Sequence, residues 1–113
     1  MKREIKFFFQ RTFRGWSDDE CWNLNYEFLK WVNSRFKKYK EQAEKVIDLE
    51  YYKLTYKKKK YTQLQIIDRI IELTNWFIEN DYYELIWSNP DKVKETQNEI
   101  FDLFKLVFDL MWW

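Results

Sequence analysis

Residues 62–78 read TQLQIIDRIIELTNWFI. Apolar side chains recur every three or four positions and neither Gly nor Pro interrupts the run, which is the pattern of an amphipathic helix. Thr62 followed by Gln65 predicts a capping box at its start. We therefore predict a helix from Thr62 to about Trp87, whose apolar stripe lies in the core. The stripe comprises Leu64, Ile66, Ile67, Ile70, Ile71, Leu73, Phe77 and Ile78.

Two further helices are predicted on either side of this one. Ser17 has Glu20 three positions on, a second capping box, and the helix it starts continues to about Tyr39. The sequence leaves open whether residues 40–56 extend that helix or follow a kink. Pro90 is expected in the first turn of the last helix.

The last helix changes character near its end, because residues 100–113 contain only three polar side chains. A helix that is apolar almost all round is expected to be buried almost all round. We therefore place it at the centre of the bundle or in the interface of a homo-oligomer. The rings assigned to such an interface are Phe101, Phe108, Trp112 and Trp113.

The first residues carry a different pattern. Ile5, Phe7 and Phe9 alternate with other side chains, which predicts an extended arm over residues 1–16. Residues 17–113 then form one domain. With one Gly and one Pro in 113 residues, little turn chemistry is present, so the predicted fold class is all-α, a helical bundle of three to four helices with an extended N-terminal arm.

Charge is unevenly distributed although the net charge is only +1. Lys and Arg outnumber acids in residues 1–16 and 35–60, and acids dominate residues 17–34 and 61–113. Such asymmetry fits either a face that attracts an anion or basic and acidic helices that pair with each other. No apolar run is long enough for a membrane span, and the chain shows no export signal.

The residue types that most catalytic and metal sites need are missing. The chain has no His and a single Cys, so neither a zinc site nor a nucleophile paired with His can form, and one Gly cannot build a phosphate loop. We therefore expect a protein that is not an enzyme and has no cofactor and no metal. Cys21 is expected to be a small core residue.

One group of residues suggests a binding site. Arg11, Arg14, Trp16 and Trp22 surround the predicted helix start, where arginines can clamp a phosphate and indoles can stack on a base. The alternative is structural: a capping box with Trp16 packed beside it.

A second basic group follows at Lys57, Lys58, Lys59 and Lys60, interleaved with tyrosines and expected to be a loop because adjacent like charges repel on a helix. It is assigned either to the same ligand site or to a solvated loop. Nucleic acid is possible but not favoured as a partner, because the net charge is near zero.

Residues 14–25, RGWSDDECWNLN, resemble a segment of a family of small uncharacterised proteins of tailed bacteriophages, with the fixed spacing of Arg, Gly, acids and Trp. The chain departs from that pattern at Asn25, where Asp is more usual. The resemblance implies a phage protein that acts in the host cytoplasm during infection, and it implies no activity.

Three functions follow as expectations. The first is a phage counter-defence protein that sequesters a small anionic, nucleotide-like ligand, in a site assembled between copies of a homo-oligomer. The second is a phage inhibitor, such as an anti-CRISPR protein, that docks on a host defence protein, with its surplus aromatic rings as interface anchors. The third is a structural or assembly homo-oligomer. None of them involves a membrane.

Overall fold

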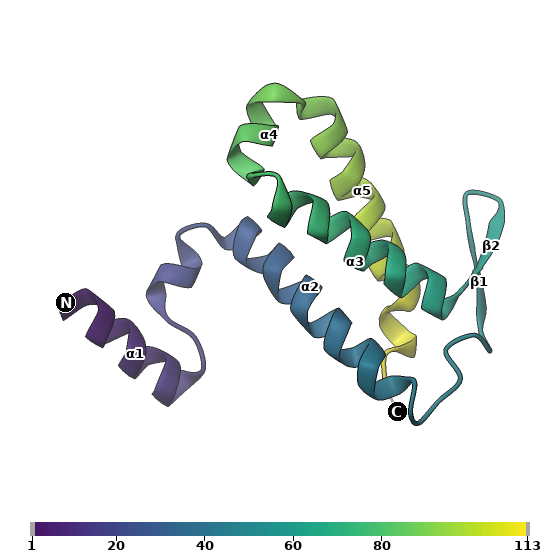
Figure 1. Cartoon of the computed structure of the whole chain (residues 1–113), viewed down its shortest axis with the longest axis horizontal. Coiled ribbons are helices and arrows are strands. Elements are labelled where there is room, and N and C mark those ends of the chain that lie inside the picture. Colours follow the sequence, from purple (N-terminus) through teal and green to yellow (C-terminus); the bar gives the residue numbers. More distant parts are fainter. Residues whose placement is uncertain (1, 113) are drawn as a thin grey trace.

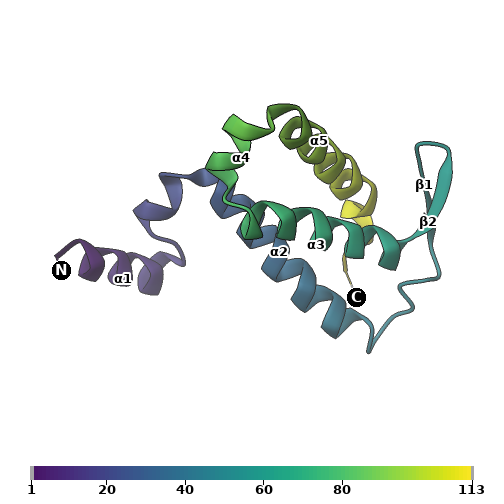
Figure 2. The same cartoon turned by 45° about the horizontal axis from the view of Figure 1, so that its top comes forward.

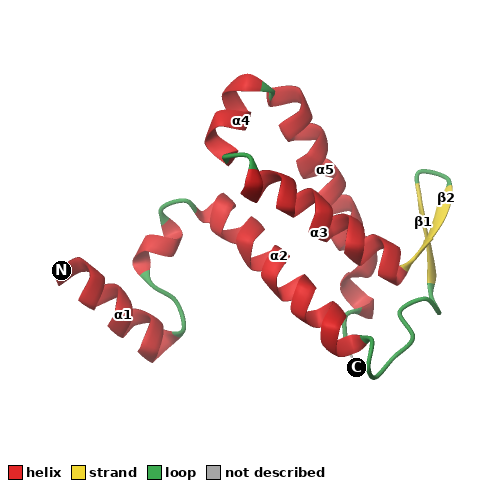
Figure 3. Cartoon of the chain, in the orientation of Figure 1, coloured by secondary structure: helices red, strands yellow, loops and turns green. Residues whose placement is uncertain are grey.

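The computed structural model describes residues 2–112. Helices α2, α3 and α5 lie side by side, with α3 in contact with both others (Figures 1 and 2). The two β-strands form a hairpin that projects at the opposite end of the molecule from α1 (Figure 3). In chain order the elements are α1 (Lys2–Arg14), the 3-10 helix η1 (Asp18–Cys21), α2 (Leu24–Ala43), β1 (Lys53–Tyr56), β2 (Lys59–Thr62), α3 (Gln63–Glu79), α4 (Tyr82–Ser88), α5 (Pro90–Val107) and the 3-10 helix η2 (Phe108–Leu110).

The prediction of a mostly helical protein is confirmed. The finer prediction, a bundle of three to four helices, is not. The described residues contain five α-helices and a small antiparallel sheet. Only α2, α3 and α5 form the central layer, α4 is a short connection, and α1 stands apart from them (Figure 1).

Helix α3 is central because it packs against both α2 and α5. Its residues Ile66, Ile67, Ile70, Leu73 and Phe77 are all buried, more buried apolar side chains than any other described helix provides. Each fully buried side chain of this size contributes roughly 1.5–3 kcal/mol of transfer free energy.

The predicted start of α3 is confirmed. The Gln65 backbone N–H donates to Thr62 Oγ1 at 3.1 Å, and the Thr62 N–H donates to Gln65 Oε1 at 2.8 Å. The predicted end is wrong, since α3 ends at Glu79. Asp81 has φ +40, which no continuing helix allows, and its carboxylate accepts from the N–H of Tyr83 at 3.2 Å to begin α4.

A polar network joins α2 to α3 inside the core. Asn33 is buried and donates from Nδ2 to Thr74 Oγ1 at 2.9 Å and to Asn75 Oδ1 at 2.8 Å. Thr74 in turn donates to the Ile70 carbonyl at 2.8 Å. Because these groups satisfy one another, the network fixes how α2 and α3 align.

The extended N-terminal arm is a wrong prediction, because residues 2–14 form helix α1. In this helix Phe7 is buried against the protein, whereas Ile5 and Phe9 are exposed, so the alternation of these residues does not mark one face of a strand. A lone strand would have left its backbone unpaired, whereas a helix satisfies it internally. Gly15, with φ +86, ends α1, and its N–H donates to the Arg11 carbonyl at 3.0 Å.

Residues 40–56, for which the sequence left a continued helix or a kink open, complete α2 and then lead into the first strand of a β-hairpin. Helix α2 ends at Ala43, turns follow, and β1 pairs with β2 in antiparallel register, with Leu54 opposite Tyr61. The predicted loop at 57–60 is partly correct: Lys57 and Lys58 form the turn, and Lys59 and Lys60 belong to β2.

Helix α5 begins with Pro90, as predicted. Its apolar end is not buried all round. Ile100, Leu103 and Val107 are buried, while Phe101 and Phe108 are exposed. The reason is that α5 lies on one side of α3, which covers a single face of it. Trp112 is also exposed, and Trp113 lies outside the described residues. Across residues 2–112, every helix is too short or too polar to span a membrane.

Candidate binding surfaces

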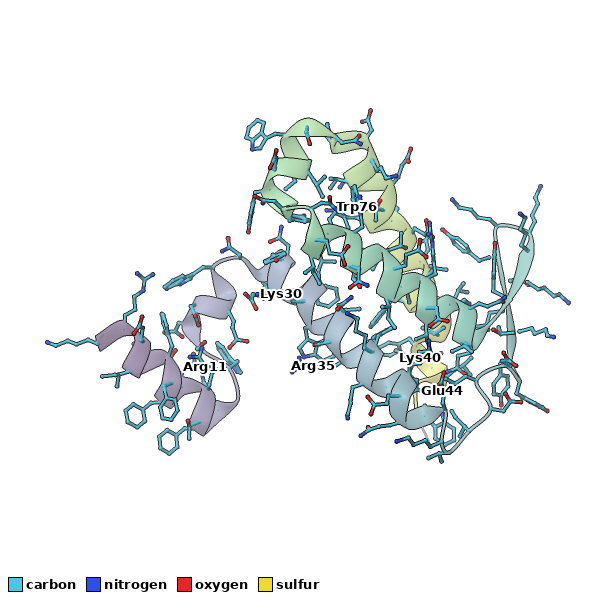
Figure 4. All side chains as sticks on the ribbon, viewed as in Figure 1. Arg11, Lys30, Arg35, Lys40, Glu44 and Trp76 are labelled. Carbon is cyan, nitrogen blue, oxygen red and sulfur yellow. The ribbon has the colours of Figure 1, made fainter. Side chains whose placement is uncertain are left out.

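The predicted arginines lie at the junction of α1 and η1, where acidic side chains engage them. The guanidinium of Arg14 lies over the Trp16 ring, 3.7 Å from its centroid, and its Nη2 donates to Asp18 Oδ1 at 2.5 Å. Arg11, labelled in Figure 4, has its Nη1 3.7 Å from Asp19 Oδ1. Both positive charges are therefore paired within the protomer.

Asp18 is the centre of this junction. Its Oδ2 accepts from Gln10 Nε2 at 2.8 Å, its N–H donates to Gln10 Oε1 at 2.7 Å, and the Lys6 ammonium lies 3.4 Å away. The hydrogen bond from Gln10, reinforced by Arg14 and Lys6, lowers the pKa of Asp18 to about 2. The carboxylate thus occupies the place where an anionic ligand of these cations would lie.

Trp22 is also used to hold α1. Its ring packs edge-on against the buried ring of Phe7, with centroids 5.3 Å apart, and the Arg3 guanidinium lies 4.2 Å from its centroid. We call the set that joins α1 to η1 and Trp22 the N-terminal clasp. Its members are Arg3, Phe7, Gln10, Arg14, Asp18 and Trp22.

An apolar groove lies beside the clasp, and its lining was not predicted from the sequence as a unit. Its volume is about 480 Å³, and it lies between η1 and the first turns of α2. Leu24 is 63% exposed and Trp31 49% exposed. We name it the aromatic groove, and it is lined by Trp16, Glu20, Cys21, Leu24, Glu27, Phe28 and Trp31.

The two carboxylates of the aromatic groove are already engaged. Glu20 accepts from the Ser17 N–H at 2.7 Å, completing the predicted capping box, and Glu27 pairs with the Lys30 ammonium at 2.8 Å. Glu27 accordingly raises the pKa of Lys30. What remains free in the groove is hydrocarbon and ring surface.

Cys21 corrects one prediction. It was expected in the core, but it is exposed on the groove wall. The helix that was predicted to start at Ser17 is here a 3-10 turn followed by a new start at Leu24, so residues 18–21 do not continue the buried stripe of α2. Trp31 likewise lies outside the core although its spacing widens that stripe.

Apolar surface continues from the groove onto α5. Phe28 stacks on Phe101, with centroids 5.9 Å apart and planes 13° from parallel, and the other side of Phe101 is exposed. Three of the four rings predicted for an oligomer interface are exposed: Phe101 on α5, Phe108 in η2 and Trp112 after it.

Helix α1 adds a second exposed apolar face. The side opposite the clasp carries Ile5, Phe8, Phe9 and Phe13, all exposed, with Phe13 at 81%. Phe9 and Phe13 stack on each other, with ring centroids 6.1 Å apart, so they cover part of their own surface, but both remain exposed. Such a cluster of exposed rings is typical of an interaction surface.

The predicted lysines do not join the arginines. Lys57, Lys58, Lys59 and Lys60 are on the hairpin, and α1 lies at the other end of the protein (Figure 1). One protomer therefore cannot form a single site from both groups.

A cleft between α3 and α5 was not predicted. Arg69 donates from Nε to Glu99 Oε2 at 2.6 Å and from Nη1 to Glu72 Oε1 at 2.9 Å. Glu99 raises the pKa of Arg69 further above its ordinary value. The pair of Arg69 with Glu99 therefore joins α3 to α5 across this cleft. The sequence gives one weak indication of this ion pair, since Arg69 is the only basic residue between residues 61 and 91, among many acids.

No protein-family model, curated protein or solved structure matches the chain. The resemblance of residues 14–25 to phage proteins therefore stays a prediction. Within residues 2–112, no group of three or more Cys, Asp or Glu side chains is placed to hold a metal ion.

Proposed function

We propose that this protein is a non-catalytic binding protein whose partner is another protein. The observation that carries the proposal is the aromatic groove with its extension over Phe101, where large rings stay exposed beside a well-packed core. Aromatic side chains are the residues that most often dominate the energy of protein interfaces. Exposed rings of this number are costly in a protein that binds nothing.

The groove suits an apolar side chain or helix of a partner better than a phosphate. Its lining is mostly apolar, and its charged groups are two carboxylates, of which Glu27 pairs with Lys30 and Glu20 accepts from the Ser17 N–H, so neither attracts a phosphate. The arginines on which the nucleotide-like ligand was predicted are paired with Asp18 and Asp19. A nucleotide would have to displace both carboxylates before it could use those cations.

The partner we propose is a bacterial host defence protein, with the chain acting as a phage-encoded inhibitor. This rests on the resemblance of residues 14–25 to small phage proteins, and those residues form one wall of the groove. Trp16 and Leu24 both belong to that segment and to the groove lining.

The test is affinity capture from bacterial lysate, compared across variants. Leu24→Asp places a charge in the groove at the first residue of α2, where an acid suits the helix dipole, so the fold should be retained. Trp31→Gln removes a groove ring. Trp87→Gln is the matched control, because Trp87 is an exposed tryptophan on α4 outside the groove.

We expect a bacterial protein that wild type and Trp87→Gln retain equally and that both groove variants lose. Equal retention by all four proteins would contradict the proposal. The remaining alternative is that the groove binds a second copy of the chain, and sedimentation equilibrium of the same proteins tests it. A self-association that Leu24→Asp abolishes would identify the partner as that second copy.

A further inference from the structure

The β1–β2 hairpin carries a row of cations that the proposed function does not use. Lys53, Lys57, Lys58, Lys59 and Lys60 are all exposed. Within residues 2–112, none of their ammonium groups takes part in an ion pair. The Lys57 ammonium lies 5.4 Å from the Tyr56 ring centroid, an interaction that leaves its charge in place. Figure 4 shows nitrogen-tipped side chains projecting from the hairpin into solvent.

The strand register divides the strand lysines between the two faces of the hairpin. Lys53 pairs with Thr62 and Thr55 with Lys60, so Lys53 and Lys60 share the outer face. Lys59 pairs with Tyr56 and lies on the opposite face with Leu54 and Tyr61, which pack toward the core, but the Lys59 side chain beside the turn is exposed. Lys53, Lys60 and the two turn lysines therefore form a basic edge, and Lys59 adds a charge next to the turn.

The turn is built at a conformational cost. Lys57 has φ +49 and Lys58 φ +69, so both central residues adopt the left-handed region that a type I′ turn requires. Asn-Gly is the pair that adopts this turn without strain, and long L side chains adopt it reluctantly. A hairpin that only had to fold would be better served by Asn-Gly, so the two lysines point to a role for their charge.

Exposed rings lie at the foot of the hairpin. Tyr51 is 73% exposed, and Tyr51, Tyr52 and Trp112 line a hollow of about 400 Å³. The two tyrosine rings meet edge to face at 5.1 Å, which leaves ring faces open. The one carboxylate in the hollow, Asp48, accepts from the Glu50 N–H at 3.0 Å.

We propose that the hairpin and the hollow at its foot bind single-stranded nucleic acid. The lysines take successive phosphates, and the rings stack on unpaired bases. Stacking on rings beside a basic edge is how proteins bind single strands without reading their sequence. A duplex or an anionic membrane would contact the lysines, but it offers no unpaired base to stack on the rings. The near-neutral net charge does not oppose this, because the segment that contains the hairpin lysines, residues 35–60, carries ten Lys and Arg against four acids.

The experiment measures binding of the full chain to a short fluorescein-labelled oligo(dT) by fluorescence anisotropy, over a titration from low to physiological salt. We expect log K to fall linearly with log salt, by about 0.7 for each phosphate contacted. Lys57→Asn with Lys58→Gly installs the favoured turn pair and removes two charges. This variant should melt at a higher temperature than wild type, bind more weakly, and show a slope smaller by about 1.4.

Three further variants separate the contributions of the charges, the rings and the aromatic groove. Lys94→Gln with Lys105→Gln removes two exposed charges from α5, so its slope should equal that of wild type. Tyr51→Ala should weaken binding while leaving the slope unchanged, because it removes stacking and no charge. Leu24→Asp should bind oligo(dT) as wild type does, which separates this site from the proposed protein-docking groove.

Three results would overturn the proposal. The first is a lack of oligo(dT) binding at low salt. The others are equal binding by wild type and the Lys57→Asn, Lys58→Gly variant, and equal affinity for a duplex of the same length. Binding to phosphatidylglycerol vesicles with none to oligo(dT) would assign the lysines to a membrane surface instead.

Discussion

Replacing Phe7 with alanine removes the one ring by which α1 is buried against the rest of the protein. Phe7 is 8% exposed, and its contacts are with Trp22 and Arg3 of the N-terminal clasp. Burial of a phenylalanine side chain contributes about 1.5–3 kcal/mol. Since 1.4 kcal/mol is a factor of ten, the docking equilibrium of α1 should fall by roughly 10- to 150-fold.

Amide hydrogen exchange followed by NMR measures this directly. In Phe7→Ala, amides in the second half of α1 should exchange roughly 10- to 150-fold faster, while those of α3 keep their protection, because α1 contributes nothing to the central core. Phe9→Ala is the control: Phe9 is on the same helix and 51% exposed, so its removal should leave α1 docked. Equal acceleration in both variants, or loss of protection in α3, would refute the account of the clasp.

Three further predictions concern the same structure. The pKa of Asp18 is lowered to about 2 in the clasp, so the carboxylate is protonated more readily when α1 is undocked. The clasp should therefore be intact above about pH 4 and weaken as the pH falls toward 2. The side-chain amide resonances of Gln10 report this change, and a Gln10 signal unchanged at pH 2 would count against it. Asn33→Ala should lower the free energy of unfolding in urea by about 1–3 kcal/mol, since it strips the polar network between α2 and α3, and a change near zero would show that the network is dispensable. Gly15→Ala should weaken α1 docking by about 1 kcal/mol through backbone strain alone, because no atom lies within 4 Å of the added methyl, and exchange rates in α1 equal to wild type would contradict this.

What the sequence could predict was local and periodic. The capping box of Thr62 and Gln65, the stripe of α3 and the position of Pro90 depend on spacing within a few residues, and all three are confirmed. The end of α3 depends on Asp81 adopting positive φ, for which no Gly or Pro gives a signal.

The wrong predictions have two causes. The arm is a helix because of a contact distant in the sequence: Phe7 alternates with Ile5 and Phe9 as a strand would, and only its contact with Trp22 shows that α1 is a helix with one buried ring. The hairpin was missed for a local reason, since its turn forms at two lysines that turn preferences disfavour.

The candidate site was predicted only in part. The Arg and Trp residues near Ser17 do gather in space, but Arg14 pairs with Asp18, a partner that also lies in the predicted motif. The aromatic groove was missed because Leu24 and Trp31 have the spacing of core residues, and whether such residues are covered depends on where α1 and η1 lie.

The central claim is that another protein occupies the aromatic groove, and the chain's single cysteine gives the most direct measurement of it. Cys21 is exposed and lines the groove, so a thiol-reactive photocrosslinker can be attached there without any mutation. The account predicts that illumination in bacterial lysate yields one dominant protein adduct from Cys21. It also predicts that this adduct is absent when the crosslinker is moved to α4 in Cys21→Ser with Ser88→Cys. The same adducts from both positions, or none from Cys21, would contradict it.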